Sequence, residues 1–546
     1  MKKRFPHKDK VLLVNITRLG DMLQATPTVA GMKLENPNCK ISVVVEKQFE
    51  SVCRLIPHID EVISIDLSMT VRALTREGEG IVDAYEYLSD FVNELRSRKF
   101  DYCLNMSSSA YTAMLLQLVG IKRNGGWTSD EEGYRVIESE WARLFATSVF
   151  HQNRQFNSLN LVDVFRCSAD VERHPDHLVI DVPEKDMEYA RQMLADAKFT
   201  NRGPIISIQA GASQGKRQWA PENFVKLINL LLNKLHARVV LIGSAKEMNI
   251  IQPIKDGCNS ENVFVAAGKT DIAQLAGILK QSSLLITGDT GPMHIAAAVK
   301  TPVLSMFLAS AFGYETGPYG KDNLVLQPII GCGPCNPNKS CARPDCHFHL
   351  EAEAVAALTE MRLNGPVHSI PENLVDPRKV IVFNTCFDQY GFYHQTHLTP
   401  AKYDQLDPYR TAYRKLWLDD LGGYDVGTSG SGSLLRTAPD LGNDLTKVID
   451  CANEGVRLIG ELERLVKDIA SPPLLLGKVN DELTELDRQI EQVGYHIPWL
   501  GPLTRMFVFA KENISGTEAL ELASQMAGVY SDLGRRCRKL GTYLNN

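Results

Sequence analysis

The sequence predicts an α/β protein with two doubly wound domains and a mainly helical region after them. Short apolar runs suited to buried strands alternate with amphipathic helical patterns, and this alternation occurs twice. A polar segment near residues 181–203 separates the two series. Further on, apolar residues recur every three or four positions, which is typical of packed helices. We therefore expect domains at residues 1–182, 183–365 and 366–546.

The composition limits the classes of function. The 546 residues are 44% apolar and 23% charged, as in soluble globular proteins, and suffice for more than two domains. The net charge of −6 argues against a dedicated nucleic-acid binder, which would be basic. The sequence shows neither an apolar run of membrane-spanning length nor a signal-peptide core. We expect a cytoplasmic protein that has no nucleic-acid partner and is at most peripherally associated with membranes.

The first series predicts a parallel sheet covered by helices. A turn, Arg18–Asp21, separates its first strand from a helix that contains Pro27 near its start. The expected strands are Val11–Val14, Ile41–Val45, Val62–Ile65 and Asp101–Met106, and the expected helices are Met22–Leu34 and Ile81–Ser97.

The second series repeats this pattern after Gly203-Pro204. The expected strands are Ile205–Ile208, Val239–Ile242, Val263–Val265 and Leu284–Ile286, and the expected helices are Met187–Ala197, Phe224–Leu235, Ile272–Leu279 and Met293–Val299. Val380–Phe383 is expected to add a further strand.

The region from residue 366 onward changes character. Gly427–Ser433 (GTSGSGS) has the composition of a flexible linker, and three helical patterns follow it, near 445–469, 479–493 and 517–533. We interpret the basic run Arg535–Lys539 as a solvated helix terminus rather than a membrane or nucleic-acid patch. These helices are expected to pack on themselves, on the α/β domains or on another copy, as in a homo-oligomer.

The stretch SLLITGDTGPMHIAAAV holds the most informative turn. A buried strand leads into Gly288-Asp289-Thr290-Gly291, and Pro292 suits the first position of a helix. A tight turn at a helix start presents backbone N–H groups and a positive dipole end to an anion. His294, one turn inside the helix, could help to hold a phosphate. The alternative is an ordinary strand-turn-helix with a buried histidine.

Three other turns carry polar residues. Asp21 follows the first strand, where a carboxylate could accept a proton as a general base or merely cap the next helix. The loop from Gly211 to Arg217 offers backbone N–H groups, the Ser213 hydroxyl and two cations to a diphosphate, or is a solvated basic loop. Glu247 could hold ribose hydroxyls, although a glutamate in a first helical turn is ordinary.

Several of these stretches resemble the motifs of glycosyltransferase family 9, the ADP-heptose heptosyltransferases and their relatives. The similar stretches are RLGDMLQATPTVAGMK, GASQGKRQWAPENF, GDTGPMHIAAAVKTPVLSMF and YETGPYG, in that order. The resemblance covers roughly residues 10–355 and implies a GT-B architecture, in which two Rossmann-like domains face a cleft. It does not cover the C-terminal helices.

The resemblance also implies roles for individual residues. Asp21 matches the position taken as the catalytic base, and Glu247 matches a position associated with the nucleoside. Either Lys216 or Arg217 fills the role of the phosphate-binding lysine. The implied donor-binding residues are Gly211, Ser213, Lys216, Arg217, Glu247, Asp289, Thr290, Gly291 and His294.

Four of the twelve cysteines lie in one short segment as Cys332-Gly-Pro-Cys335 and Cys341-x₄-Cys346. Pairs of thiolates at such spacing can complete a tetrahedral site for zinc or iron. Members of the family carry a cysteine loop here, and a protein-modifying branch binds iron through cysteines. We expect a structural metal at this loop, the alternative being four reduced thiols. Catalysis itself is expected to require no cofactor.

These observations favour an inverting glycosyltransferase. The predicted reaction moves a sugar, heptose by resemblance, from an ADP-sugar to a hydroxyl of a glycan, a lipopolysaccharide core or a protein, with Asp21 as the base. One alternative is a non-catalytic GT-B scaffold that acts through the helical region. Another is a different GT-B nucleotide-sugar enzyme, such as an epimerase.

Overall fold

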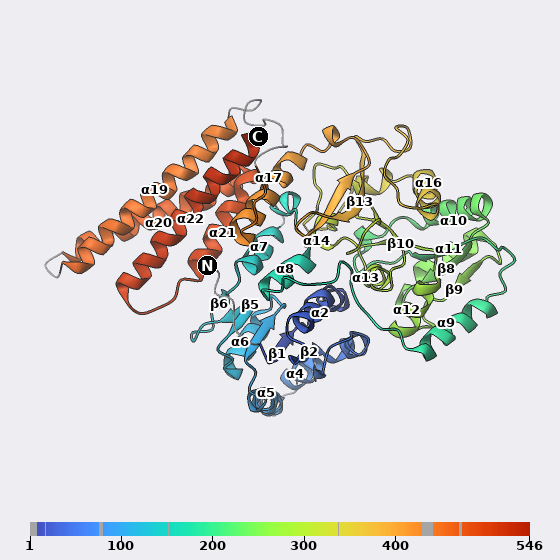
Figure 1. The fold of residues 1–546 in the computed structure, drawn as a ribbon, viewed down its shortest axis with the longest axis horizontal. Helices are drawn as coiled ribbons and strands as arrows, with labels where there is room; N and C mark the ends of the chain where they lie inside the picture. The colour runs from blue at the N-terminus through green and yellow to red at the C-terminus, as the bar shows by residue number, and fades with distance from the viewer. Residues whose placement is uncertain are drawn as a thin grey trace. The chain divides into compact units, whose positions relative to one another are not determined.

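The computed structural model describes residues 8–16, 18–75, 80–150, 152–336, 338–427, 440–468 and 472–545. The chain forms two compact units (Figure 1). The first contains residues 1–125 and 159–404, and the second contains residues 126–158 and 405–546. Residues 428–433 of the predicted flexible linker lie outside the described residues.

The first unit begins with a parallel sheet in the order β3-β2-β1-β4. Its strands are β1 (Lys10–Val14), β2 (Lys40–Glu46), β3 (Glu61–Ile65) and β4 (Tyr102–Asn105). Its helical elements are α1 (Leu19–Gln24), α2 (Thr26–Glu35), η1 (Lys47–Phe49), α3 (Glu50–Cys53), α4 (Leu67–Leu74), α5 (Gly80–Ser97), α6 (Ala110–Val119) and α8 (Leu161–Ser168). The continuous apolar runs of β1 and β2 are buried, as expected for strands covered on both faces.

The helix expected at Met22–Leu34 is instead two helices. α1 ends at Gln24 and α2 starts at Thr26, with Ala25 between them. Pro27 explains the break, because proline lacks an N–H and suits the first turn of a helix better than its interior.

The second sheet of this unit has the order β14-β13-β12-β11-β10-β7-β8-β9. Its pairings are parallel from β12 to β9, and β13 pairs antiparallel with both β12 and β14. Its strands are β7 (Ile205–Gln209), β8 (Arg238–Ile242), β9 (Val263–Val265), β10 (Leu284–Gly288), β11 (Val303–Met306), β12 (Leu324–Pro328), β13 (Val380–Phe387) and β14 (Tyr393–His397). Its helical elements are α9 (Glu184–Asp196), η3 (Gly215–Arg217), α10 (Pro221–Leu235), η4 (Ala245–Glu247), α11 (Met248–Cys258), α12 (Ile272–Gln281), α13 (Gly291–Ala298), α14 (Gly313–Thr316), α15 (Asp345–Phe348), α16 (Ala352–Leu363) and η5 (Ala401–Tyr403).

Two groups of helices cover this second sheet. α10 contacts α11 and α16, whereas α12 contacts α9 and α13 (Figure 1). The buried face of α10 carries Phe224, Leu227, Ile228 and Leu231 at helical spacing, and these side chains join the sheet in one apolar core. The prediction of two Rossmann-like α/β domains before a mainly helical region is thereby confirmed.

The second unit is mainly helical and contains one hairpin. Its elements are β5 (Asn124–Ser129, which starts in the first unit), β6 (Arg135–Ile137), α7 (Glu140–Ser148), η2 (Arg154–Phe156), α17 (Asp407–Trp417), η6 (Leu418–Gly422, a π-helix), α19 (Asp440–Lys467), α20 (Pro473–His496), η7 (Pro498–Leu500), α21 (Gly501–Glu512) and α22 (Ala519–Asn545). α19 and α22 pack along each other, and a side chain at Gly455 would overlap the ring of Tyr530.

The units divide the chain differently from the predicted domain limits. β13 and β14 extend the second sheet, so residues 366–404 lie with the α/β part. The segment 126–158 lies with the helical part, where Trp127, Ile137 and Ala142 form a core with Phe509.

The basic run near the C-terminal end is not a solvated helix terminus. Arg535 and Arg536 lie inside α22 and pair with the buried Asp420 of η6, and Arg536 also pairs with Glu140. These cations therefore hold the helical unit together. Among the described helices, none combines the length and apolar composition needed to cross a membrane.

Candidate active site

The turn after β1 places Asp21 inside the first turn of α1. The residue at the N-cap position is Arg18, and Asp21 is half-buried three residues further on. Asp21 is therefore a residue of the first helical turn and not the N-cap itself. Its backbone oxygen instead accepts a hydrogen bond from the N–H of Ala25, so the short helix holds the residue in place.

The turn after β10 leads directly into α13, as the sequence predicted for the expected anion site. Thr290 is the N-cap residue of α13, and its hydroxyl bonds the Thr287 hydroxyl at 2.9 Å. Within the described residues, the Thr290 side chain accepts no hydrogen bond from the backbone N–H groups at the start of α13. Such N–H groups, together with the positive end of the helix dipole, attract an anion.

These two turns, from different sheets of the first unit, lie in contact. A Cβ atom at Gly20 would lie 3.0 Å from Cδ2 of His294, and one at Gly291 would lie 3.0 Å from Cδ2 of Leu19. Both glycines thus permit a close approach of α1 to α13. Asp21, next to Gly20 in sequence, is thereby brought beside the predicted anion site.

The cation at this site is Arg217. Its Nη1 donates to Oδ2 of Asp289 at 3.1 Å, and its Nε donates to the Ser310 hydroxyl at 2.8 Å. The Thr316 hydroxyl donates to the other Asp289 oxygen at 3.1 Å. Thr316 lies in the stretch YETGPYG, whereas Ser310 gave no signal in the sequence.

Lys216, the other candidate cation, is directed toward the cysteine loop. Its Nζ donates to the backbone oxygens of Asn336 and Lys339 at 2.9 and 2.8 Å. The Lys216 oxygen lies 2.8 Å from Nε2 of His347, whose own oxygen accepts a hydrogen bond from the Trp219 indole at 3.3 Å. The cysteine loop is therefore fastened to the loop that carries Arg217, through contacts that the sequence did not reveal.

The remaining donor-side residues lie on neighbouring loops. Glu247 closes a capping box with Ser244, and its other oxygen accepts a hydrogen bond from Gln209 at 2.9 Å. A Cβ atom at Gly211 would overlap the Glu247 carboxylate, so these two loops touch. The Ser213 side chain is exposed. The capping box explains the contact between Glu247 and Ser244 in structural terms.

His294 is buried and uncharged. Burial lowers its pKa to about 4, although the negative charge of Asp289 acts in the opposite direction. Its Nδ1 has no hydrogen-bond partner within the described part of the chain. The imidazole is therefore neutral near pH 7, unlike a cationic phosphate ligand.

The four cysteines of the predicted metal site lie near one another but not at ligand spacing. Burial and the neighbouring Cys332 thiol raise the pKa of Cys335 to about 11, with smaller effects from Cys346 and Cys341. Within the described residues, no three of these thiols lie within 4.8 Å of one another. All four are free thiols. A metal would have to draw them closer together, so the arrangement does not by itself form a tetrahedral site.

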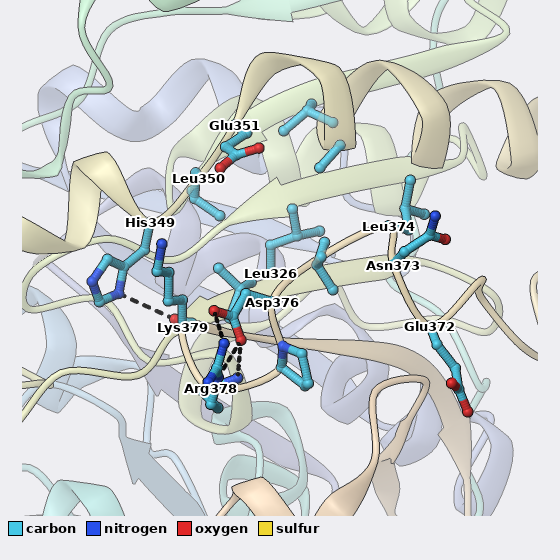
Figure 2. A pocket seen from close by; sticks show the side chains of 15 residues that line it. Leu326, His349, Leu350, Glu351, Glu372, Asn373, Leu374, Asp376, Arg378 and Lys379 are labelled. Carbon is cyan, nitrogen blue, oxygen red and sulfur yellow. Dashed lines mark hydrogen bonds and ion pairs between the residues drawn. The ribbon is translucent and has the colours of Figure 1, made fainter.

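A cavity of about 430 Å³ lies beside the loop at residues 372–380 and the start of α16. In Figure 2, Arg378 pairs with Asp376, and His349 contacts the backbone oxygen of Lys379. None of the predicted site residues that the structure describes lines this cavity. The predicted site residues lie instead on the turns around the contact between α1 and α13.

Comparison with known proteins identifies a family that the chain resembles. Residues 89–344 match the model of glycosyltransferase family 9 (heptosyltransferase). The chain is 25% identical over 303 residues to lipopolysaccharide heptosyltransferase 3 of Escherichia coli K12, which covers 53% of this chain and 80% of that protein. It is 22% identical over 326 residues to lipooligosaccharide heptosyltransferase 2 of Haemophilus influenzae, with 59% and 89% covered.

A solved structure shares the fold. The family 9 glycosyltransferase of Veillonella parvula DSM 2008 aligns with a TM-score of 0.51 and 18% identity. The alignment covers 65% of this chain and 97% of that one. The likeness supports the GT-B fold of the α/β part.

Proposed function

Because this chain is a heptosyltransferase-like glycosyltransferase of family 9, we propose that it transfers heptose from ADP-heptose to a hydroxyl of a core-type glycan. One observation carries the proposal. The turn that bears Asp21 packs against the start of α13, which supports a base of one sheet acting next to a proposed anion site of the other. A transferase needs this juxtaposition because its base and its leaving group must act on the same anomeric carbon.

In the proposed reaction, Asp21 accepts the proton of the acceptor hydroxyl while that oxygen forms a bond to the anomeric carbon. The bond from this carbon to the donor phosphate oxygen breaks, and its electron pair leaves with ADP. The displacement is in line and inverts the anomeric centre. A single base suffices because no covalent sugar–enzyme intermediate forms.

The leaving diphosphate is proposed to lie between the start of α13 and Arg217. Backbone N–H groups at Thr290 and Gly291 would face the growing negative charge, and Arg217 would share its guanidinium between Asp289 and the phosphates. Lys216 would instead fasten the loop to its neighbour. This assigns the phosphate role to Arg217, one of the two cations left open by the sequence.

Other donor-side residues receive subsidiary roles in the proposal. Glu247 would bind the ribose while it remains in its capping box, and Gly211 would let that carboxylate lie against the backbone. Ser213 would reach the diphosphate from the exposed part of its loop.

The acceptor is proposed to be a glycan rather than a protein. The relatives above are named for lipopolysaccharide and lipooligosaccharide, whose core sugars offer hydroxyl groups. The reaction would occur in the cytoplasm, with at most peripheral membrane contact. The helical unit would support the enzyme or join copies of it into an oligomer.

The cysteine loop is proposed to bind zinc or iron in a structural role. The ion would draw together the thiols of Cys332, Cys335, Cys341 and Cys346 and so stiffen the loop that Lys216 contacts. Elemental analysis of protein purified without added metal tests this. About one ion per chain, lost with loop cysteine-to-serine substitutions, is expected.

The main test combines nucleotide binding with transfer. Calorimetry should show that the unsubstituted protein binds ADP and ADP-heptose more tightly than UDP or GDP. Asp21→Asn should lower kcat by about 10²–10⁴-fold, with the Kd for ADP nearly unchanged, because a carboxamide cannot act as the base.

Asp66→Asn is the matched control, because Asp66 follows β3 at the same edge of the first sheet. It should leave kcat within about threefold. A preference for UDP would contradict the ADP-sugar donor. Full activity of Asp21→Asn would contradict the base, and a changed nucleotide sugar formed without acceptor would favour an epimerase. ADP binding without any transfer would favour the scaffold.

A further inference from the structure

His294 occupies the contact between the two halves of the site. The residue is only 4% exposed and lies in the first turn of α13. The Cδ2–Nε2 edge of its ring faces Gly20, since a Cβ atom there would lie 3.0 Å from Cδ2 and 3.4 Å from Nε2. The turn that bears Asp21 therefore packs against the His294 ring.

The charge state of the ring argues against a direct phosphate role. A phosphate ligand works best as a cation, whereas burial lowers the pKa of His294 to about 4. Arg217 already supplies positive charge beside Asp289. The site therefore has no need of a second cation at this position.

The ring of His294 and the turn at Gly20 are closely packed. Distances of 3.0–3.4 Å from a newly added carbon leave no space for a methyl group unless the ring or the turn moves. A second close contact, between Leu19 and Gly291, limits the movement of α1 along α13. Since α1 has only six residues, a shift of Gly20 also shifts Asp21.

We infer that the His294 ring is a positioning residue that sets Asp21 at its distance from the anomeric carbon. This inference rests on the proposed transferase function. It differs from a phosphate-binding role, which would change donor affinity, and from a passive core histidine, which would change only stability.

A double-mutant cycle tests the inference. The variants are Gly20→Ala, His294→Ala and the combination of both, each measured for kcat with ADP-heptose, for the Kd of ADP and for thermal stability. Each single variant should lower kcat by about tenfold, because the contact must give by a few tenths of an ångström and a full 1 Å displacement of a catalytic group costs about 100-fold. The Kd for ADP should stay within about twofold, because the diphosphate contacts persist.

The double variant gives the most specific expectation. Without the ring, the alanine methyl at position 20 has nothing to strike, so Gly20→Ala should have almost no additional effect on kcat or stability in the His294→Ala background. His294→Asn, which keeps a planar uncharged group, should recover part of the kcat lost in His294→Ala.

Three outcomes would overturn the inference. The first is a Kd for ADP raised about tenfold in His294→Ala with kcat unchanged. The second is additive effects of the two substitutions on kcat and stability. The third is an unchanged kcat in both single variants. Failure of the proposed function itself is distinguishable, because the unsubstituted protein would then neither bind ADP nor transfer sugar. In that case the stability cycle still decides whether the ring supports the turn, and a role in positioning the base is overturned.

Discussion

Each unit of the molecule contains an arginine paired with an aspartate, and the two pairs differ in what surrounds them. In the α/β unit, Arg217 and Asp289 keep 11% and 14% of their side chains exposed beside an uncapped helix start. In the helical unit, Asp420 is 1% exposed and pairs with Arg535 and Arg536. The first pair can exchange partners with an incoming anion, whereas the second is enclosed by its own chain.

Charge pairing alone therefore does not mark a site. Both pairs involve basic residues that stand out in the sequence as short clusters. The two differ because the backbone N–H groups at the start of α13 lie next to the Arg217–Asp289 pair. Substitution in the Arg217–Asp289 pair should therefore affect binding, whereas substitution of Asp420 should affect stability.

The largest effect is expected from Asp420→Asn. Removal of this buried carboxylate takes a counter-charge from Arg535 and Arg536. Asp532 and Glu140 still pair with these arginines, so the free energy of unfolding should fall by about 3 kcal/mol, the low end for a broken buried pair. Urea unfolding measures this loss. Asp419→Asn is the control, because Asp419 is 28% exposed and its loss should cost less. Equal losses in the two variants would contradict the distinction between an enclosed and an open carboxylate.

A smaller effect, on binding instead of folding, is expected from Arg217→Gln. Loss of a charge-assisted contact should raise the Kd for ADP by about 10–100-fold, since such bonds contribute about 1.5–3 kcal/mol. Calorimetry measures this change. Lys216→Gln is the neighbouring control and should raise the Kd less, because its ammonium bonds backbone oxygens of Asn336 and Lys339. A larger effect of Lys216→Gln would reverse the two assignments.

A third expectation concerns pH. The folded pKa of His294, about 4, lies below its ordinary value of 6.5, so between these values the unfolded chain binds a proton that the folded chain does not. Stability should therefore fall as the pH drops through this interval, by about 2 kcal/mol from this residue at pH 5.

Urea unfolding of the protein and of His294→Asn at pH 7 and pH 5 isolates this contribution. His294→Asn should lose less stability on acidification than the unsubstituted protein. The exposed histidine variant His368→Asn should follow the unsubstituted protein. Parallel curves for the protein and His294→Asn would show that the ring is not held neutral by burial.

The sequence allowed prediction of those parts that depend on local pattern. The apolar run before Gly288 and the proline after Gly291 indicated the strand, turn and helix that the structure contains. The turn at Arg18–Asp21 was located for the same reason. In both cases neighbouring residues determine the backbone, so a short window suffices.

Long-range contacts could not be predicted in this way. Nothing local distinguishes Lys216 from Arg217, whose different roles depend on Asn336 and Asp289, more than 70 residues away. The contribution of Ser310 was missed because an isolated serine has no pattern. The segment 126–158 was assigned to the first domain because its partners, such as Phe509, lie far along the chain.

The divided helical unit has a consequence for synthesis. Its first segment ends at Ser158 and its second starts at Gln405, so a ribosome adds about 250 residues between them, which takes on the order of 10–50 s. During this time Trp127 and Ile137 lack the covering Phe509. The nascent chain therefore carries an apolar surface through most of its translation, and chaperones that bind emerging chains would encounter it there.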